Sequence, residues 1–457
     1  MATARPLRKI LGLGFGLAFA FGTMVGVGIL RLPGMVAEAA GSPTLIIFCW
    51  CAGAVYALMG AVSVSELAAM YPEAGGFRVY ARRAFGEVAG FVVGWIDWLA
   101  TVAVMAYAAV SAVAFLGTLW PAVAEYETAG AIVLIGVFTV MHSLGVRMGS
   151  AITAVASAMI GVLMLALIAR CFIAAPMAHP IGLGGAAVAP KAAAFGIGTV
   201  LALIPAIRAL ITAYDGWYAP IYTAEECVNT SRTLPRSIIG GALLVAVLYV
   251  TLNVALLRVL SVPELAASKL PVAVAAHIVF PHGSDLVMTV LSILIVLGLI
   301  NGNAIMGPRV LFSMAREGWI SQKAAAVSPG GTPWVALLAT TVMSSAMILS
   351  GTFNQLIALF AVLILLYYIA AFLAVFVLRY RSPEAIRPYR AFGYPIATFA
   401  VLAGSIGFLA ATIIEERHSA LMALVFLLSC IPAYALASRS RSVRVAELQL
   451  SAPPTAG

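Results

Sequence analysis

Residues 11–41 read LGLGFGLAFAFGTMVGVGILRLPGMVAEAAG, and residues 196–226 read GIGTVLALIPAIRALITAYDGWYAPIYTAEE. Each stretch is apolar and longer than the roughly 20 residues that a helix needs to cross a bilayer. Helix-breaking residues interrupt both stretches, namely Gly22, Gly26, Gly28 and Pro33 in the first and Pro205, Gly216 and Pro220 in the second. A broken helix leaves backbone N–H and C=O groups unpaired, which a membrane protein tolerates only where those groups line a cavity. The two stretches therefore predict two broken membrane-spanning helices that face a cavity.

The remainder of the chain is also suited to a membrane. Of its 457 residues, 63% are hydrophobic and only 9% are charged, whereas soluble proteins carry about 25% charged residues. The net charge of +9 arises from short basic clusters between apolar runs and does not indicate a nucleic-acid-binding surface. We predict an all-α integral membrane protein with about twelve spans, at residues 11–40, 43–70, 88–117, 129–146, 149–173, 196–228, 236–260, 284–314, 333–351, 356–379, 393–414 and 418–437.

The spans are expected to form a single transmembrane domain with internal symmetry. Broken spans one and six are corresponding members of two five-helix halves, an arrangement typical of inverted-repeat transporters that bind substrate near the bilayer midplane. Repeat 1 is expected at residues 11–173, repeat 2 at 196–379 and two further helices at 393–437, between tails at 1–10 and 438–457. Lys and Arg concentrate on the side of the two tails, which predicts a multi-pass protein of the cell (inner) membrane with both termini in the cytoplasm.

The first break, Gly26-Val27-Gly28, is suited to bind a carboxylate. Glycines let a ligand approach the backbone closely, and the second half-helix, which begins near Ile29, presents the positive end of its dipole there. The alternative is that Gly22 and Gly26, four residues apart, only allow two helices to pack closely. The matching break in span six favours the binding site.

The second break contains Ala213, Tyr214, Asp215, Gly216 and Trp217. A charged side chain at the bilayer centre costs about 2.5–3.5 kcal/mol, so Asp215 is expected to face a cavity or a partner. Carbonyl groups at the end of the outer half-helix favour an ammonium group, and Tyr214 and Trp217 offer aromatic walls. A role of Asp215 as the N-cap of the inner half-helix is compatible with this interpretation. A carboxylate site opposite an ammonium site describes an α-amino acid.

Charged residues near the two ends of the expected cavity are candidate gates. Arg31, one turn beyond the first break, is either an outer gate or a side chain that extends to the interface. Arg208 lies on the same helix face as Asp215 but about 10 Å away along the axis, too far for a direct pair. Near the cytoplasmic face, solvated loop charges are favoured over inner-gate salt bridges for Glu66, Glu73, Glu225 and Glu226.

Four motifs carry a resemblance to a known family. They are GTMVGVGILRLPG (22–34), SVSELAAMYPEAGGFRVYARRAFG (63–86), AYDGWYAPIYTAEECVNTSRTLPRSI (213–238) and INGNAIMGPRVLFSMAREGWI (300–320). In this order they resemble the amino acid–polyamine–organocation (APC) superfamily of amino acid permeases, and the AYDGW form looks closest to bacterial relatives of the L-type amino acid exchangers. The likeness extends over nearly the whole chain.

The resemblance implies a LeuT-type fold of two inverted five-helix repeats plus two C-terminal helices. It also implies that the substrate carboxylate binds at residues 26–28 and that the amino group binds the carbonyls of residues 213–215. Proton-coupled bacterial relatives carry a lysine midway along span five, where this chain has SAMIG at 157–161. Sodium coupling would require hydroxyls in span eight, where this chain offers Asn301 and Asn303. Exchange or facilitated diffusion is therefore preferred. The animal exchangers attach a partner glycoprotein through a cysteine in the outer loop after span three, and because residues 119–130 lack a cysteine, no disulfide-linked partner subunit is expected.

These observations predict a secondary active or exchange transporter (an antiporter) of amino acids that works by alternating access. Neutral L-amino acids are preferred because little acid beyond Asp215 is expected in the pocket. The alternatives are a proton-coupled permease for cationic amino acids or polyamines and, more distantly, an amino acid-binding membrane sensor. Candidates for the remaining pocket walls are Met105, Tyr107, Asn301 and Tyr367. No GxSxG or HExxH motif is present, so enzyme activity, a cofactor and a metal are not expected.

Overall fold

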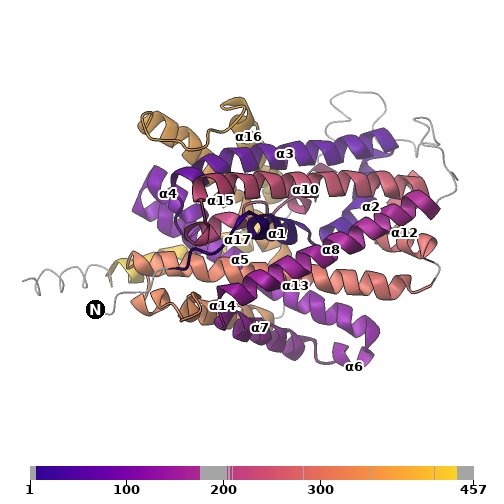
Figure 1. The fold of residues 1–457 in the computed structure, drawn as a ribbon, viewed down its shortest axis with the longest axis horizontal. Coiled ribbons are helices and arrows are strands. Elements are labelled where there is room, and N and C mark those ends of the chain that lie inside the picture. The colour runs from indigo at the N-terminus through magenta and orange to yellow at the C-terminus, as the bar shows by residue number, and fades with distance from the viewer. Residues whose placement is uncertain are drawn as a thin grey trace, which may run out of the picture.

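The structure is a computed structural model that describes residues 7–174, 203, 206–207, 209–280, 282–350, 353–415 and 417–439. Within these residues the chain is helical, and most of the long helices run side by side (Figure 1). The helices are α1 (Leu13–Met24), α2 (Gly28–Ala40), α3 (Pro43–Met70), α4 (Phe77–Phe85), α5 (Glu87–Leu119), α6 (Pro121–Ala124), α7 (Glu127–Ser143), α8 (Val146–Ala174), η1 (Ala219–Glu226), α10 (Thr230–Val259), α11 (Val262–Ala267), α12 (Pro271–Val279), α13 (Ser284–Arg316), η2 (Gln322–Ala325), α14 (Trp334–Leu349), α15 (Phe353–Arg381), α16 (Ile396–Glu415) and α17 (Arg417–Leu428).

The prediction of a multi-span membrane protein is confirmed. Seven helices are long and apolar enough to cross a membrane, namely α3, α5, α8, α10, α13, α15 and α16. The pair α1 and α2 forms a further, bent span, and α7, α14 and the segment Ala423–Arg439 are shorter apolar helices. Each predicted span has a counterpart among these helices except the sixth, whose first half lies mostly outside the described residues.

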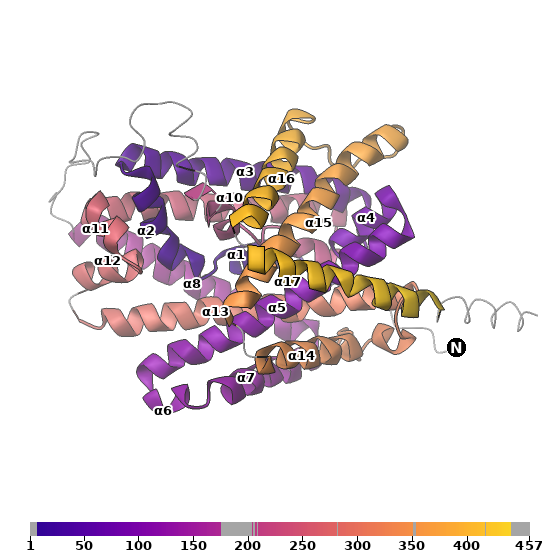
Figure 2. The same ribbon diagram turned by 180° about the vertical axis from the view of Figure 1, so that it is seen from behind.

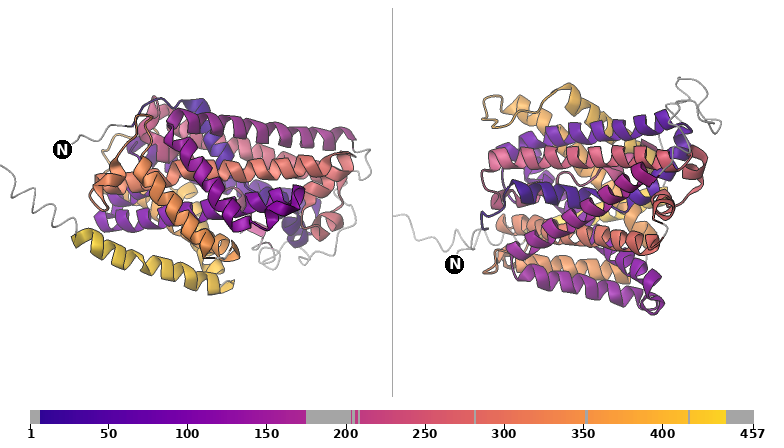
Figure 3. Two further views of the ribbon diagram at one scale, coloured as in Figure 1. Left: turned by 90° about the horizontal axis from the view of Figure 1, so that it is seen from below. Right: turned by 45° about the vertical axis from the view of Figure 1, so that its right-hand side comes forward.

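The two ends of the bundle differ. The described N-terminal residues, α4 and the C-terminal end of α15 lie at one end, which we call the tail end, and α6, α11 and α12 lie at the far end (Figures 1 and 2). Two further views show the same separation (Figure 3). The two halves of the first span have different neighbours, because α1 packs against α8 and α10 whereas α2 packs against α3, α11 and α12.

The first break lies where the sequence predicts it. The helix α1 ends at Met24, Val25 has an extended backbone (φ −75°, ψ 90°), and α2 begins at Gly28. The axes of the two half-helices are bent by 53°. The amides of Gly26 and Val27, which lie outside both half-helices, donate no backbone hydrogen bond within the described part of the chain. The Gly26 amide faces the Tyr249 hydroxyl, and the break leaves the Val27 amide as a donor for another acceptor.

The second break spans residues 214–218. Helical residues end at Ala213, the next five form turns, and the chain continues as the 3₁₀ helix η1. Gly216 has a φ of +104°, and a Cβ atom at this position would lie 2.6 Å from the Thr23 carbonyl oxygen. Only glycine suits this backbone and this close approach. Asp215 does not cap η1, because the N-cap residue is Tyr218 and its side chain makes no capping bond.

Candidate substrate site

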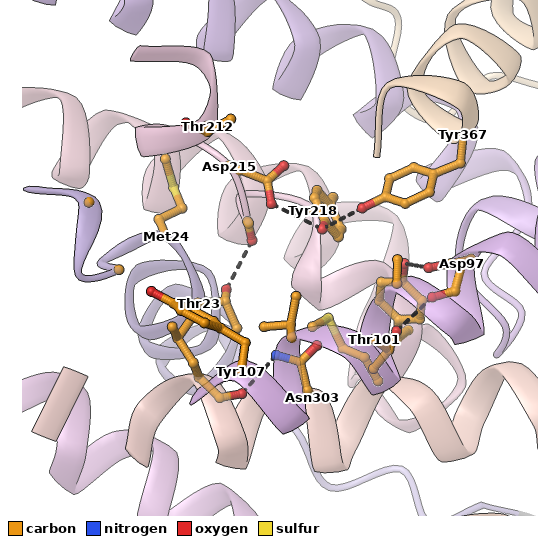
Figure 4. A pocket seen from close by; sticks show the side chains of 18 of the residues that line it. Thr23, Met24, Asp97, Thr101, Tyr107, Thr212, Asp215, Tyr218, Asn303 and Tyr367 are labelled. Atoms are coloured by element: carbon orange, nitrogen blue, oxygen red, sulfur yellow. Dashed lines mark hydrogen bonds between the residues drawn. The ribbon is translucent and has the colours of Figure 1, made fainter. Parts of the chain in front are cut away.

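A cavity of about 210 Å³ lies between the two breaks and the helices α5, α13 and α15 (Figure 4). Its lining is mixed, with apolar side chains beside hydroxyls, an amide and two carboxyl groups. The residues that line it are Thr23, Met24, Gly26, Val27, Gly28, Asp97, Ala100, Thr101, Val104, Tyr107, Thr212, Asp215, Gly216, Tyr218, Tyr222, Leu299, Asn303, Met306 and Tyr367. Five of the eight residues expected at the two breaks are among them, namely Gly26, Val27, Gly28, Asp215 and Gly216.

The two breaks are in direct contact beside the cavity. The Thr23 hydroxyl donates a hydrogen bond of 2.9 Å to the carbonyl oxygen of Gly216 (Figure 4). The same hydroxyl also bonds the Phe19 carbonyl within α1, so that one side chain joins α1 to the second break. The Tyr249 hydroxyl on α10 donates to the Met24 carbonyl at 3.1 Å and satisfies the last turn of α1. These bonds fix the two breaks relative to each other.

Three of the expected site residues direct their side chains elsewhere. The Tyr214 hydroxyl donates to the Trp50 carbonyl at 3.1 Å, and the Tyr214 ring packs against Trp50 and Tyr249. The Trp217 ring stacks on Tyr368. Residues 213, 214 and 217 are not part of the cavity lining among the described residues. The backbone carbonyls of residues 213–215, in contrast to these side chains, accept no backbone hydrogen bond within the described part of the chain.

Asp215 is held by tyrosine hydroxyls. Tyr368 on α15 donates to Asp215 Oδ1, and Tyr218 donates to Asp215 Oδ2 at 3.3 Å. The Tyr218 hydroxyl also pairs with the Tyr367 hydroxyl at 2.8 Å (Figure 4). The carboxylate thus joins the second break to α15. Two donors stabilise a charge that the bilayer interior disfavours.

A second acid lines the cavity, and the expectation of little acid beyond Asp215 is wrong. Asp97 on α5 is 1% exposed, and its Oδ1 accepts a hydrogen bond of 2.6 Å from the Tyr222 hydroxyl (Figure 4). The sequence contains a signal for this residue, because Asp97 is a lone carboxylate within the apolar run GWIDWLATV. The rule that singles out Asp215 in span six applies equally to Asp97 in span three.

The other proposed wall residues divide into two groups. Tyr107 and Tyr367 line the cavity. Met105 is buried in the core without lining the cavity. Asn301 Oδ1 accepts a hydrogen bond of 2.9 Å from His142 Nε2, and Asn301 Nδ2 donates to the Thr153 hydroxyl at 2.7 Å, so that Asn301 ties α13 to α7 and α8. Asn303, two residues later, faces the cavity instead (Figure 4).

Aromatic rings close the tail end of the cavity. The ring of Phe77, the first residue of α4, stacks on Tyr367 with centroids 4.7 Å apart. The same ring makes edge contacts with Tyr218 and Tyr222 on the second broken span. All four rings are buried, with Tyr218 the most exposed at 4%. A substrate that left toward the tail end would have to separate these rings.

Ion pairs reinforce this closure, and the preference for solvated loop charges is wrong for Glu226. Both Glu226 oxygens accept from the Arg309 guanidinium on α13, at 2.5 and 2.8 Å, and both side chains are buried. The neighbouring Glu225 pairs with Arg316 in a more exposed position. Further pairs join α4 to the end of α13 and to the preceding loop, namely Arg78–Glu317, Arg82–Glu317, Arg82–Glu73 and Arg83–Glu73.

Glu66 is also buried and paired instead of solvated. Its carboxylate accepts hydrogen bonds from Arg379 at 2.9 and 2.6 Å, from Arg387 at 3.2 Å and from the backbone amide of Ala391 at 2.7 Å. These contacts fasten α3 to the end of α15 and to the segment that follows it. Together with the pairs of Glu226, they show that the tail end is held by buried electrostatic contacts.

The far end of the cavity lacks comparable closure among the described residues. Thr212, which lines the cavity at the second break, is exposed, and Tyr107 and Gly28 are partly exposed. Arg31 is exposed and does not line the cavity. Arg208, the other candidate gate, lies outside the described residues. The structure therefore has a closed tail end, which we call the closed gate.

Comparisons with known proteins show the family of this chain. A family model described as amino acid permease matches residues 16–434. The serine/threonine exchanger SteT of Bacillus subtilis is 28% identical over 446 residues, which cover 94% of this chain and 96% of that protein. The b(0,+)-type amino acid transporter 1 of Mus musculus is 28% identical over 93% of this chain and 86% of that protein. The glutamate/serine transporter AimA of Bacillus subtilis is 28% identical over 54% of this chain and 46% of that protein.

Proposed function

This chain belongs to the amino acid permease family, and we propose that it exchanges small neutral L-amino acids by alternating access through the cavity between its two broken spans. It is a multi-pass membrane protein that transports amino acids and is not an enzyme. The substrate carboxylate binds the amides of Gly26 and Val27 and the start of α2 at Gly28. The amino group binds the free carbonyls of residues 213–215.

One observation carries this proposal, namely that the cavity lies against both breaks, at Gly26, Val27 and Gly28 in the first and at Thr212, Asp215 and Gly216 in the second. The amides of Gly26 and Val27 and the carbonyls of residues 213–215 have no backbone partner among the described residues. The Thr23–Gly216 hydrogen bond holds the two breaks together. A zwitterionic backbone offers the complementary acceptor and donor groups, and helix termini of this kind bind charged groups well.

The size and lining of the cavity support a small neutral substrate. A cavity of about 150 Å³ accommodates the six carbon atoms of benzene. The present cavity of about 210 Å³ therefore has room for roughly eight heavy atoms at the same density. Serine has seven heavy atoms and threonine has eight. No basic side chain is found among the described lining residues, whereas Met24, Val104 and Leu299 offer apolar contacts.

The names of the relatives support exchange. SteT is named as a serine/threonine exchanger, and the chain matches almost its full length. AimA is named as a glutamate/serine transporter. Both names include serine, which fits the volume of the cavity. We therefore take L-serine as the first substrate to test.

The arrangement of charge supports a position in the cell (inner) membrane with both termini in the cytoplasm. Basic residues gather at the tail end, for example Arg82, Arg83 and Arg381, as the positive-inside rule requires of a cytoplasmic face. The closed gate is then the cytoplasmic gate. We retain the inverted repeats at 11–173 and 196–379 and the extra helices at 393–437. Four of the five cysteines are buried and Cys51 lies within α3, which supports the absence of a disulfide-linked partner subunit.

Uptake into proteoliposomes tests the proposed function. Vesicles are loaded with unlabelled L-serine or left empty, and the uptake of radiolabelled L-serine is measured with and without a pH gradient. We expect saturable, stereospecific uptake that requires internal serine. Uptake into empty vesicles driven by the gradient would contradict exchange and support the proton-coupled permease, and binding without flux would support the sensor. Competition by lysine and putrescine, compared with alanine and threonine, tests the preference for neutral substrates.

A further inference from the structure

Asp97 is a buried carboxylic acid at the closed end of the cavity (Figure 4). The Tyr222 hydroxyl donates to its Oδ1, and the backbone N–H of Phe77 at the start of α4 faces the same carboxyl group. Its Oδ2 is buried and has no hydrogen-bond partner within the described part of the chain. An ionised Asp97 would therefore keep a charged oxygen without a donor, an arrangement that folded proteins avoid.

No positive charge compensates Asp97 among the described residues. The cavity lining contains no Lys, Arg or His there, and Asp215 adds a second negative group. The buried guanidinium groups of the closed gate pair with other acids, Arg309 with Glu226 and Arg78 with Glu317, although the Nε atom of Arg78 has no partner within the described part of the chain. The titratable groups that face Asp97 from the second broken span and α15 are hydroxyls, namely Tyr218, Tyr222 and Tyr367. A buried carboxyl group in such surroundings takes up a proton instead of remaining charged.

The two acids of the cavity differ in this respect. Asp215 has a tyrosine donor on each oxygen and remains partly exposed, so its charge is stabilised. Asp97 has one side-chain donor and is fully buried. A proton on Oδ2 removes the charge. The structure therefore singles out Asp97 as the proton-binding group of the cavity.

We propose that Asp97 is a proton-binding site of the transport cycle, which holds a proton while the gate at the tail end is closed and releases it when that gate opens. The proposal rests on the proposed function. The opening of the gate moves η1, and with it Tyr222, away from α5 and admits water to Asp97. Water stabilises the ionised carboxylate that the closed gate disfavours. The Oδ2–H bond then breaks, and the proton passes to water on the cytoplasmic side.

This site makes exchange depend on internal protons. Each time the gate closes over an internal amino acid, Asp97 must take a proton from the internal solution and form the Oδ2–H bond again. The proton stays on Asp97 while the substrate exchanges at the far end, and it returns to the internal solution when the gate reopens, so exchange moves no net protons. A shortage of internal protons nevertheless slows the closure of the gate. The exchange rate then falls as the internal pH rises, by up to about tenfold per pH unit for one proton.

The experiment measures serine exchange at a fixed acidic external pH while the internal pH is raised stepwise, in vesicles of known protein orientation. Four proteins are compared: the parent chain, D97N, Y222F and D285N. Asp285 is an exposed acid at the start of α13 and serves as the matched control. We expect the parent and D285N to lose exchange as the internal pH rises, and D97N to exchange at a rate that does not depend on internal pH. Y222F removes the donor that favours the ionised form, so its profile should move to higher pH.

Each outcome decides between the hypotheses. A parent profile that does not change with internal pH, or a D97N profile parallel to that of the parent, would overturn the proton site and leave the exchange function intact. Absence of serine exchange in the parent would instead refute the proposed function. A Y222F profile identical to that of the parent would show that the Tyr222 bond does not act on the proton site.

A second readout serves if D97N transports nothing. Cys227 follows η1 directly, is 2% exposed and is expected to react with thiol reagents only when the gate opens. In a background without the other four cysteines, its labelling rate from the tail side should rise with pH more steeply in the parent than in D97N. The D97N slope gives the contribution of thiolate formation alone. Equal slopes would overturn the proton site.

Discussion

The substitution E226Q tests whether the buried ion pair holds the gate at the tail end closed. Both oxygens of Glu226 bond the Arg309 guanidinium, at 2.5 and 2.8 Å, and the two side chains are 0% and 4% exposed. Removal of one partner of such a pair costs about 3–5 kcal/mol, because the other charge remains buried without compensation. In the open state Arg309 is accessible to water, so we expect this cost to fall on the closed state.

The expected shift in the balance between closed and open states follows from the different exposure of Glu226 and Glu225. A loss of about 3–5 kcal/mol shifts the balance between closed and open states by roughly 10²- to 10³-fold or more, since about 1.4 kcal/mol is a factor of ten. E225Q is the matched control, because Glu225 precedes Glu226 and its pair with Arg316 is 20% and 39% exposed. A pair of that exposure contributes about 0.2–1 kcal/mol, which is at most roughly a fivefold shift.

The assay is the labelling rate of Cys227 by a membrane-impermeant thiol reagent applied at the tail end. The other cysteines, namely Cys49, Cys51, Cys171 and Cys430, are replaced in the parent background. We expect E226Q to accelerate labelling strongly, E225Q to change it little, and the double variant E226Q/R309Q to return toward the parent because no unpaired charge remains. Equal labelling rates for E226Q and E225Q would refute the assignment of the buried pair to the gate.

Two further comparisons test the site itself. G216A places a Cβ atom 2.6 Å from the Thr23 carbonyl oxygen at a φ of +104°, so we expect a cost of about 1–3 kcal/mol, a lower Tm and weaker serine binding. In G26A the added Cβ atom has no neighbour within 4 Å and enters the cavity, so this variant should keep the parental Tm and bind serine more weakly. A parental Tm for G216A would contradict this account. Y214F loses the bond to the Trp50 carbonyl and should cost about 0.5–1.5 kcal/mol of stability without a change in the Kd for serine, whereas D215N should raise that Kd. Equal changes of Kd in Y214F and D215N, measured by scintillation proximity, would place the Tyr214 side chain in the site.

The membrane spans and the first break could be predicted because their signals are local. Apolar runs give the helices directly, and α3 begins and ends at residues 43 and 70 as predicted. The position of the first break could be predicted from Gly26 and Gly28, because two glycines separated by a single residue weaken a helix in the middle of an apolar stretch. The second break follows in the same way from Gly216 and Pro220. In each case the decisive residues lie within one span.

The contacts between spans could not be predicted, because one sequence contains no information on which distant residues meet. Glu226 and Arg309 are separated by 83 positions, and Glu66 and Arg379 by 313. Each glutamate taken alone resembles a solvated charge near a loop. The directions of the Tyr214 and Trp217 side chains could not be predicted either, because they depend on contacts with residues of α3 and α15. Asp97 is different, since its position within an apolar run was sufficient to mark it.

The position of Asp97 connects the substrate cavity to the gate through one side chain. Tyr222 donates to Asp97 at the floor of the cavity, and its ring lies against Gly76, where a Cβ atom would approach it to 2.3 Å. A substrate shifts the balance between open and closed states only if its contacts differ in free energy between the two states. Tyr218 and Tyr222 line the cavity and belong to the segment that must move, whereas Asp97 belongs to α5. We therefore expect a ligand in contact with these tyrosines to change the strength of the Tyr222–Asp97 bond, and the occupancy of the cavity to act on the gate through that bond.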